Sequence, residues 1–532
     1  MMRIRALARA ASPVRARLVA RVTAGLLMVL MPRAGAPSGT QPLALEEATV
    51  AQVEAAYRSG TLTAREVVAA YRQRIAAYDA AGPGLNVVIF LNPRAQAQAT
   101  ALDEELQRTG RPRGPLHGVP ILLKDNINTR DMPTTAGSLS LAGYTPATDA
   151  TVTRRLRAAG AIILAKVNLH EFALWGETVS SIGGQTLNPY DLSRTPGGSS
   201  GGTAVGLAAN FALAGVGTDT VNSIRSPASA NSIVGIRPTL GLVSRAGVIP
   251  YSFTQDAVGP LARTVADAAR LLSVLAGEDP GDAATAASRG HVAADYTRFL
   301  RADGVAGKRI GVLRSFFGSG ASHAEVNAVA DRAIEDLRGL GATLVELSTP
   351  ELDSGSLARE VSVHLYELKP ALNGYLAGAA APVKSLAEII ASGKFHPQVA
   401  DTLRQAQGLE LDDGYRHRLQ LRTELQQRVL AIMAEARLDA IVFPHQQRLV
   451  VPLGETQVER NGALAAVTGF PAIVVPGGFS APTPRAAVGV PVGIEFLGRP
   501  WSEDVLIEIA YGYEQATHHR RAPPSTPPLP KR

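Results

Sequence analysis

Two serines and one lysine are the residues of this chain whose types and surroundings could support covalent catalysis. A serine is a weak nucleophile until a neighbouring base accepts its proton. The chain has no cysteine that could act instead. In chain order, Lys124, Ser199 and Ser223 suggest a base, a relay and a nucleophile. They lie in the segments GVPILLKD at 118–125, PGGSSGG at 196–202 and GTDTVNSIR at 217–225.

These segments, in this order and at this spacing, resemble those of the amidase signature family, and the resemblance runs through most of the chain. It implies that Lys124 is the base, that Ser199 bridges, and that Ser223 is the nucleophile of an acyl-serine intermediate. The implied reaction is hydrolysis of a carboxylic amide to an acid plus ammonia or an amine. Aliphatic, aryl and peptide amides all stay open as substrates. The resemblance implies no metal and no organic cofactor.

One departure from the family pattern falls beside the implied nucleophile. The family reads GTDTGGS where this chain has Val221 and Asn222 in place of two glycines. In the family, backbone N–H groups at the positions of Thr220, Val221, Asn222 and Ser223 form the oxyanion hole. A β-branched residue adopts positive φ only at a cost, whereas glycine does so freely. Either the turn uses ordinary dihedrals at Val221, or the hole is reshaped. We expect the two side chains to crowd the acyl side of the scissile bond.

Less specific interpretations of these residues compete with the triad. Lys124 could reach solvent or pair with Asp125. The sequence 197–201 fits G-x-S-x-G, the nucleophile elbow of α/β-hydrolases, but an elbow must directly follow a strand, and the preceding residues 188–196 read as a loop. A phosphate-binding loop would need a lysine that this segment lacks. We expect Asp219 and Arg225 to brace the turn rather than contact substrate.

Two other functions remain open beside amide hydrolysis. The family also contains the A-type subunits of amidotransferases, which deliver ammonia to a partner acting on charged tRNA. A non-catalytic binding protein on the same fold is the third interpretation, and Val221 with Asn222 is its only support. The middle of the chain, from about 282 to 438, lacks recognisable site sequences and corresponds to the region where the family varies its substrate-covering helices. The oligomeric state is left open, with a homodimer among the options.

The charge of the chain gives no reason to expect a nucleic-acid partner. The formal net charge is +7, but seven arginines lie in the first 36 residues and the first acidic residue is Glu46. The remaining residues hold 46 basic and 46 acidic side chains. Because these remaining residues carry no net charge, they have no excess of basic side chains that would attract nucleic acid.

The arginine-rich start has the pattern of a secretory signal peptide. Arginines precede the apolar run at 22–31, and the A-x-A sequence 34–36 follows. The run is too short to span a bilayer, so no membrane span is expected. We therefore predict cleavage after about Ala36 and a periplasmic or secreted protein. A misplaced initiator or a short amphipathic helix, with a cytoplasmic location, is the alternative.

Short apolar runs that alternate with helical patterns indicate an α/β fold. The family resemblance implies a single large α/β/α domain around a twisted mixed β-sheet, and we assign it to residues 37–521. We predict two capped helices near 50 and 64, because Thr49 and Thr63 begin capping boxes. The proline-rich end at 522–532 is predicted to be disordered. We expect strands near 121–123, 161–165, 211–216, 309–313, 343–347, 440–443, 473–476 and 492–496, and helices near 150–159, 200–209, 264–275, 324–340, 415–436 and 502–516.

Overall fold

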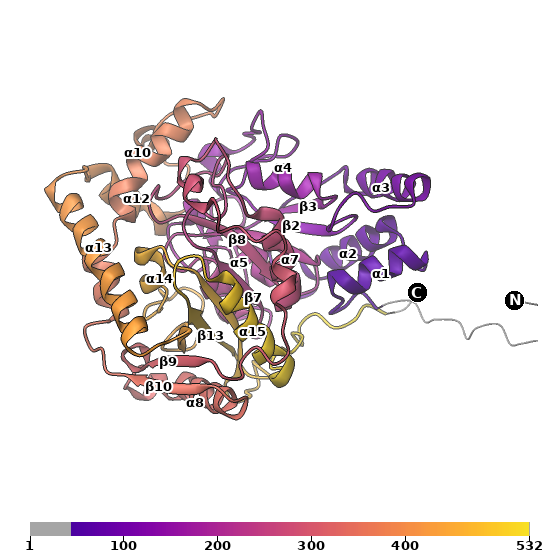
Figure 1. Cartoon of the computed structure of the whole chain (residues 1–532). Helices are drawn as coiled ribbons and strands as arrows, with labels where there is room; N and C mark the ends of the chain where they lie inside the picture. The colour runs from indigo at the N-terminus through magenta and orange to yellow at the C-terminus, as the bar shows by residue number, and fades with distance from the viewer. Residues whose placement is uncertain (1–43, 531–532) are drawn as a thin grey trace, which may run out of the picture. The chain divides into compact units, whose positions relative to one another are not determined.

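A mixed sheet of eleven strands organises residues 44–530, the part of the chain that the computed structural model describes (Figure 1). The predicted signal peptide, residues 1–36, lies outside the described residues. The strand order is β1-β3-β2-β6-β8-β7-β12-β13-β11-β9-β10. The bounds are β1 Val88–Leu91, β2 Pro120–Lys124, β3 Ile162–Val167, β6 Ala214–Asp219, β7 Val234–Arg237, β8 Ala257–Ala262, β9 Arg309–Leu313, β10 Thr343–Leu347, β11 Ala440–Pro444, β12 Ala472–Phe479 and β13 Pro491–Leu497, and a separate pair consists of β4 Val179–Ser180 and β5 Gly184–Gln185.

Helices pack along this sheet and confirm the expected single α/β domain. Figure 1 shows α8 beside β9 and β10, and α13 as a long helix in the middle region. Helix bounds are α1 Val50–Ser59, α2 Ala64–Tyr78, α3 Ala95–Thr109, α4 Thr151–Ala158, α5 Gly201–Ala208, α6 Arg225–Ala230, α7 Val265–Leu275, α8 Ala324–Gly339, α9 Ser354–Ser356, α10 His364–Ala377, α11 Leu386–Ser392, α12 Ala400–Gly408, α13 Asp413–Glu435, α14 Ala463–Thr468 and α15 Glu503–Thr517.

The first two helices begin as their sequences require. The Thr49 hydroxyl accepts from the backbone N–H of Gln52, and the Gln52 side chain accepts from the Thr49 backbone N–H. Thr63 and Glu66 form the same reciprocal pair at the start of α2. Both predicted capping boxes are therefore confirmed. They satisfy N–H groups that a helix start would leave without partners.

Parallel pairing at the centre of the sheet positions the candidate site. β2 pairs with β6 in parallel, and every residue of both strands is buried. Their carboxyl ends carry Lys124 and Asp219 respectively. Because carboxyl ends of adjacent parallel strands meet at one edge of a sheet, residues almost a hundred positions apart become neighbours.

Two central strands were not anticipated from the sequence. β8 contains Gly259 and Pro260, and both residue types argue against a central strand. The glycine is nevertheless required there, because a Cβ at Gly259 would overlap the backbone oxygen of Ile236 on β7. β7 is only four residues long, and no strand was expected at its position. The strand expected at 211–216 begins later, at Ala214, because residues 211–213 still belong to the turn after α5.

The proline-rich segment, which composition led us to expect as disordered, lies against α2. Arg74 Nη2 donates to the Thr526 carbonyl at 2.9 Å, and Arg74 Nη1 donates to the Pro527 carbonyl at 3.2 Å. The Tyr78 hydroxyl donates to the same Pro527 carbonyl at 2.7 Å. Within residues 44–530, no helix has the length and apolar content that a membrane crossing requires.

Candidate active site

Lys124 ends β2 with its ammonium group enclosed by hydroxyl groups. Its Nζ lies 2.7 Å from Ser199 Oγ and 2.7 Å from Thr218 Oγ1, and its side chain has no exposed surface. Burial lowers the pKa of Lys124 to about 7, although the charges of Asp219 and Asp256 act in the opposite direction. An amine with this pKa is half neutral near pH 7 and can accept a proton.

Asp125, the alternative partner of Lys124, is occupied elsewhere. Its Oδ1 lies 3.1 Å from Nζ of Lys166, a second buried lysine, on β3. Its Oδ2 accepts from the backbone N–H of Thr135 at 3.0 Å. The interpretation that Lys124 reaches solvent or pairs with Asp125 is therefore wrong.

Ser199 lies in the loop before α5, where the structure brings it to the lysine. The Gly198–Ser199 peptide bond is cis. The Ser199 carbonyl accepts from the backbone N–H of His170 at 3.1 Å, and the side chain is buried. No strand of the sheet leads directly into this loop, because residues 186–200 hold only turns, bends and isolated bridges. The elbow interpretation is excluded by that geometry.

Ser223 lies in the turn between β6 and α6, at the base of the cleft. Its side chain is 6% exposed, and its carbonyl accepts from the backbone N–H of Ser200 at 3.1 Å. Within residues 44–530 its Oγ makes no hydrogen bond, so it is not joined to Ser199 in this state. The two serine loops are held together through their backbones.

The four residues proposed for the oxyanion hole differ from their neighbours in that their N–H groups have no partner within residues 44–530. The backbone N–H groups of Thr220, Val221, Asn222 and Ser223 donate to no other turn, loop or side-chain group among the described residues. Neither Val221 nor Asn222 has a positive φ. The turn therefore uses ordinary dihedrals, the first of the two outcomes expected for this departure from glycine.

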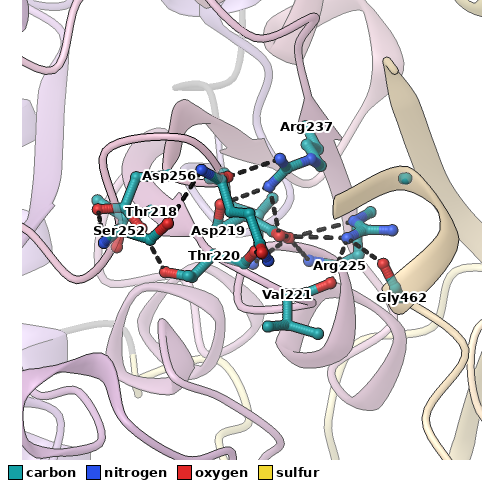
Figure 2. Close-up of polar contacts among 12 residues, drawn as sticks. Thr218, Asp219, Thr220, Val221, Arg225, Arg237, Ser252, Asp256 and Gly462 are labelled. Carbon is teal, nitrogen blue, oxygen red and sulfur yellow. Dashed lines mark hydrogen bonds and ion pairs between the residues drawn. The ribbon is translucent and has the colours of Figure 1, made fainter. Parts of the chain in front are cut away.

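A buried ion network holds this turn in place. Asp219 Oδ2 accepts from Arg225 Nε at 3.1 Å and from the Ile224 backbone N–H at 3.0 Å, and Arg237 Nη1 lies 2.9 Å from Asp219 Oδ1. Burial alone would raise the pKa of Asp219, but the two guanidinium groups outweigh it and hold this pKa well below its usual range. The expectation that Asp219 and Arg225 brace the turn is confirmed (Figure 2).

Arg225 extends the network from the turn to two other elements. Its Nη2 donates to the carbonyls of Val221 at 2.7 Å and Gly462 at 3.0 Å, and its Nη1 donates to Glu495 on β13 (Figure 2 shows the Val221 and Gly462 contacts). Glu495 also accepts from His445 Nδ1 at 2.6 Å. The carbonyl of Val221 is thus turned toward the arginine, which fixes the peptide plane whose N–H belongs to Asn222.

A second set of contacts holds the other side of the turn. Thr220 Oγ1 donates to Asp256 Oδ1 at 2.6 Å. The other oxygen of Asp256 accepts from the backbone N–H groups of Tyr251 at 2.8 Å and Ser252 at 2.9 Å. Gln255 supports the same region, since its Oε1 accepts from the Val363 backbone N–H at 2.7 Å. Gln255 and Asp256 therefore support the turn that carries Thr220.

A cleft of about 680 Å³ opens above Ser223. The middle region supplies much of its wall, as expected for a variable substrate cover. Trp175, which also lines the cleft, donates from Nε1 to Thr402 Oγ1 on α12 at 2.9 Å. This hydrogen bond connects the middle region to the segment that follows β3. Tyr251 stacks edge-on against His364, whose ring also lines the cleft. Within residues 44–530, no group of three potential metal ligands is arranged to bind an ion.

Sequence reasoning missed two residues of the site. Thr218 contacts Lys124 and also accepts from Asn126 Nδ2 at 3.1 Å, yet a threonine near a strand end carries no distinctive signal. Its place directly before Asp219, in the segment already singled out, could have identified it. Arg460 lines the cleft although it lies 235 residues beyond Arg225 in the chain, in a stretch without a recognisable pattern.

Known proteins resemble this chain over most of its length. The sequence model of the family described as Amidase matches residues 66–507. A protein of Arabidopsis thaliana named as a probable amidase is 36% identical over 492 residues, 90% of this chain and 92% of its own. The A-type subunit of the glutamyl-tRNA(Gln) amidotransferase of Chloroflexus aurantiacus is 37% identical, covering 90% of this chain and 99% of its own. The native peptide amidase of Stenotrophomonas maltophilia superposes with a TM-score of 0.81 at 40% sequence identity. The match covers 90% of this chain and 98% of the peptide amidase.

Proposed function

Since this chain belongs to the amidase family and is an enzyme that hydrolyses carboxylic amides, we propose that Lys124, Ser199 and Ser223 are its catalytic triad and that C-terminal amides of peptides are its substrates. The observation that carries the triad is the 2.7 Å contact between Lys124 Nζ and Ser199 Oγ beside the nucleophile loop. The likeness to peptide amidase and the size of the cleft support the substrate class.

The proposed reaction begins with neutral Lys124. Ser199 passes its proton to Lys124 and takes the proton of Ser223, whose Oγ then attacks the amide carbonyl. Catalytic hydrogen bonds are often long or poorly aligned in a free enzyme and tighten only when substrate is bound. Free N–H groups of the turn, those of Val221 and Asn222 among them, would stabilise the oxyanion of the tetrahedral intermediate. Ser199 returns a proton to the leaving nitrogen, and water then hydrolyses the acyl-serine.

Covalent labelling tests the nucleophile. We expect a fluorophosphonate probe to label the wild-type protein, and Ser223→Ala to abolish both labelling and hydrolysis of a peptide amide. Thr220→Ser is the matched control on the same turn and should still be labelled. If Ser223→Ala were labelled at the wild-type rate while Ser199→Ala was not, Ser199 would be the nucleophile and the proposed order would be wrong.

An ammonia-releasing component of an amidotransferase is the second candidate, and the 37% identity to such proteins favours it. The neutral charge of residues 37–532 and the signal-like start argue against a partner that handles tRNA. The two candidates differ in their substrate. Ammonia release from free glutamine, dependent on a co-purifying partner, would support the amidotransferase component, whereas turnover of peptide amides by the chain alone would support the hydrolase.

We further propose that the protein is exported, to the periplasm or beyond the cell, after cleavage near Ala36. The arginines, the apolar run and the A-x-A sequence of the first 36 residues support this proposal. N-terminal sequencing of protein from the native host tests it. A mature chain that begins shortly after Ala36 is expected, and an intact Met1 in cytosolic protein would contradict export.

A further inference from the structure

His364, the first residue of α10, presents a ring nitrogen to the cleft that contains Ser223. The side chain is half-buried and lines this cleft. Its Nε2 makes no hydrogen bond within residues 44–530, and it does not belong to the polar atoms that burial leaves without a partner. This nitrogen is therefore accessible to a molecule that occupies the cleft.

The other ring nitrogen, Nδ1, is held by Ser362. The distance from Nδ1 to Ser362 Oγ is 2.6 Å, which suits a hydroxyl donor and is shorter than an N–H donor usually allows. The hydroxyl therefore donates to Nδ1. Burial lowers the pKa of His364 to about 4, and the charge of Arg418 acts in the same direction, so the ring is neutral near pH 7. A neutral imidazole carries one N–H, and because Nδ1 accepts, Nε2 is the donor.

Gln255 orients the Ser362 hydroxyl. Its Oε1 accepts from the Val363 backbone N–H at 2.7 Å, which fixes the orientation of the amide. Its Nε2 then donates to Ser362 Oγ at 3.0 Å and to the Thr220 carbonyl at 3.4 Å. Gln255 Oε1 lies 3.2 Å from the same hydroxyl, a longer contact than the one to His364. One amide therefore contacts both the nucleophile turn and the serine that holds His364.

Large apolar side chains share the cleft with this donor. The Tyr251 ring packs edge-on against His364, with 5.1 Å between the ring centroids. Trp175 and Val458 line the same cleft and are 40% and 48% exposed. Binding sites for small molecules commonly combine apolar walls with a few placed polar groups that fix the orientation of the ligand. The oriented N–H of His364 is such a group, and it requires an acceptor on the ligand.

We propose that the Nε2–H of His364 donates a hydrogen bond to a carbonyl oxygen in the acyl part of the substrate, which makes His364 a specificity-determining residue. The oxygen of the scissile amide is already assigned to the N–H groups of the nucleophile turn. Ammonia, the leaving group of a primary amide, contains no oxygen. The carbonyl that His364 binds is therefore that of the peptide group before the amidated residue, which a simple alkyl or aryl amide lacks. This inference rests on the proposed function.

Three amides that share one side chain test the inference. N-Acetylphenylalaninamide contains the acceptor, 3-phenylpropionamide lacks it, and N-thioacetylphenylalaninamide has sulfur, a weaker acceptor, in place of the oxygen. The wild-type enzyme should prefer the acetyl over the thioacetyl compound by about 3- to 10-fold in kcat/KM, the factor that one hydrogen bond supplies. His364→Phe keeps a ring against Tyr251 but has no donor, so it should remove most of this preference and lower the preference over 3-phenylpropionamide.

Two further variants separate the donor from other effects of the substitution. His364→Gln keeps an N–H donor and should retain part of the preference for the acetyl compound. His417→Phe is the control, because His417 is exposed on α13 and does not line the cleft. It should leave both ratios unchanged. Because each value is a ratio of two substrates, a general loss of activity cancels.

The protonation of the ring can be measured without turnover. ¹⁵N NMR of histidine-labelled protein at pH 7, with the His364 signals assigned by their loss in His364→Phe, should show a protonated Nε2 and an unprotonated Nδ1. Ser362→Ala removes the hydroxyl that donates to Nδ1, so both tautomers should become populated and the preference for the acetyl compound should fall.

These measurements distinguish a wrong inference from a wrong function. A protonated Nδ1 in the wild-type protein would overturn the inference, and so would ratios that His364→Phe leaves unchanged in an enzyme that hydrolyses these peptide amides. In either case the proposed function would stand. If the wild-type enzyme hydrolysed none of the three amides, the proposed substrate class would fail and this inference with it.

Discussion

The amine of Lys124 lies in surroundings that favour its neutral form, and this determines how activity depends on pH. The pKa of about 7 lies below the ordinary value of 10.5 because burial removes water from the charged form. As the pH falls through 7, the folded enzyme gains a proton on the group that must accept one. We expect kcat/KM on a neutral amide to fall about tenfold per pH unit well below 7, and to level off above it.

A pH–rate profile between pH 5 and 9 measures this dependence. Lys124→Ala should lose nearly all turnover across the whole range while remaining folded. The profile and the variant must agree, since both report the same proton acceptor. A flat profile together with an active Lys124→Ala enzyme would remove Lys124 from the mechanism.

Val221 places a branched side chain at the cleft beside the nucleophile, with an ordinary backbone conformation. Val221→Gly should therefore widen the acyl side of the site while leaving the backbone donors in place. We expect the kcat/KM ratio of a bulky to a small acyl amide to rise. The substitution should also cost roughly 0.4–1 kcal/mol of stability, since glycine adds freedom to the unfolded chain. An unchanged ratio would mean that Val221 does not limit acyl size.

At the scale of elements, Arg225 joins β6, β13 and the start of α14 through one buried guanidinium. Removing it leaves the carboxylates of Asp219 and Glu495 buried with fewer partners. We expect Arg225→Met to lower the free energy of unfolding by about 3–5 kcal/mol, measured by urea denaturation. The control is Arg314→Met, because Arg314 pairs with Asp331 and Glu346 at the surface, where ion pairs contribute about 0–1 kcal/mol. Equal effects in the two variants would contradict a buried network.

The segments that carry the candidate triad could be read from the sequence because each combines an unusual residue with a restrictive backbone. A lysine after a buried apolar strand and a serine among four glycines have few ordinary explanations. The strand β8 could not be read in the same way, because its Gly259 and Pro260 argue against a strand, and the reason for the glycine is a close contact with β7, a tertiary effect. Arg460 likewise could not be identified from the sequence, because only the fold brings it to the cleft that contains Ser223.

At the scale of the whole molecule, residues 526 and 527, near the end of the described chain, accept hydrogen bonds from side chains of α2. Arg74 is 2% exposed, and two of its hydrogen bonds go to the carbonyls of Thr526 and Pro527. We expect a chain that ends at residue 521 to be less stable by roughly 2–4 kcal/mol, since bonds to a buried charged group are lost. Thermal or urea denaturation of the full and shortened chains measures the difference.

Arg74→Met provides the matched comparison for that deletion. If the tail acts through the guanidinium, shortening the chain should cost clearly less in the Arg74→Met background than in the wild type. Equal costs in both backgrounds would mean that the tail stabilises the protein through other contacts, and an absent cost would mean that this segment does not bind α2 in solution.

The same contact has a consequence for how the protein is made. Residues near position 74 leave the ribosome long before residues 526 and 527, and at about 5–20 residues per second the delay is many seconds. During that time α2 has emerged, but its arginine lacks two of the carbonyls that it binds in the finished molecule. The amino-terminal helices can therefore reach their final state only after residues 526 and 527 have left the ribosome. For a chain proposed to cross a membrane, α2 would then lack these two hydrogen bonds during most of synthesis, which would make it easier to unfold for export.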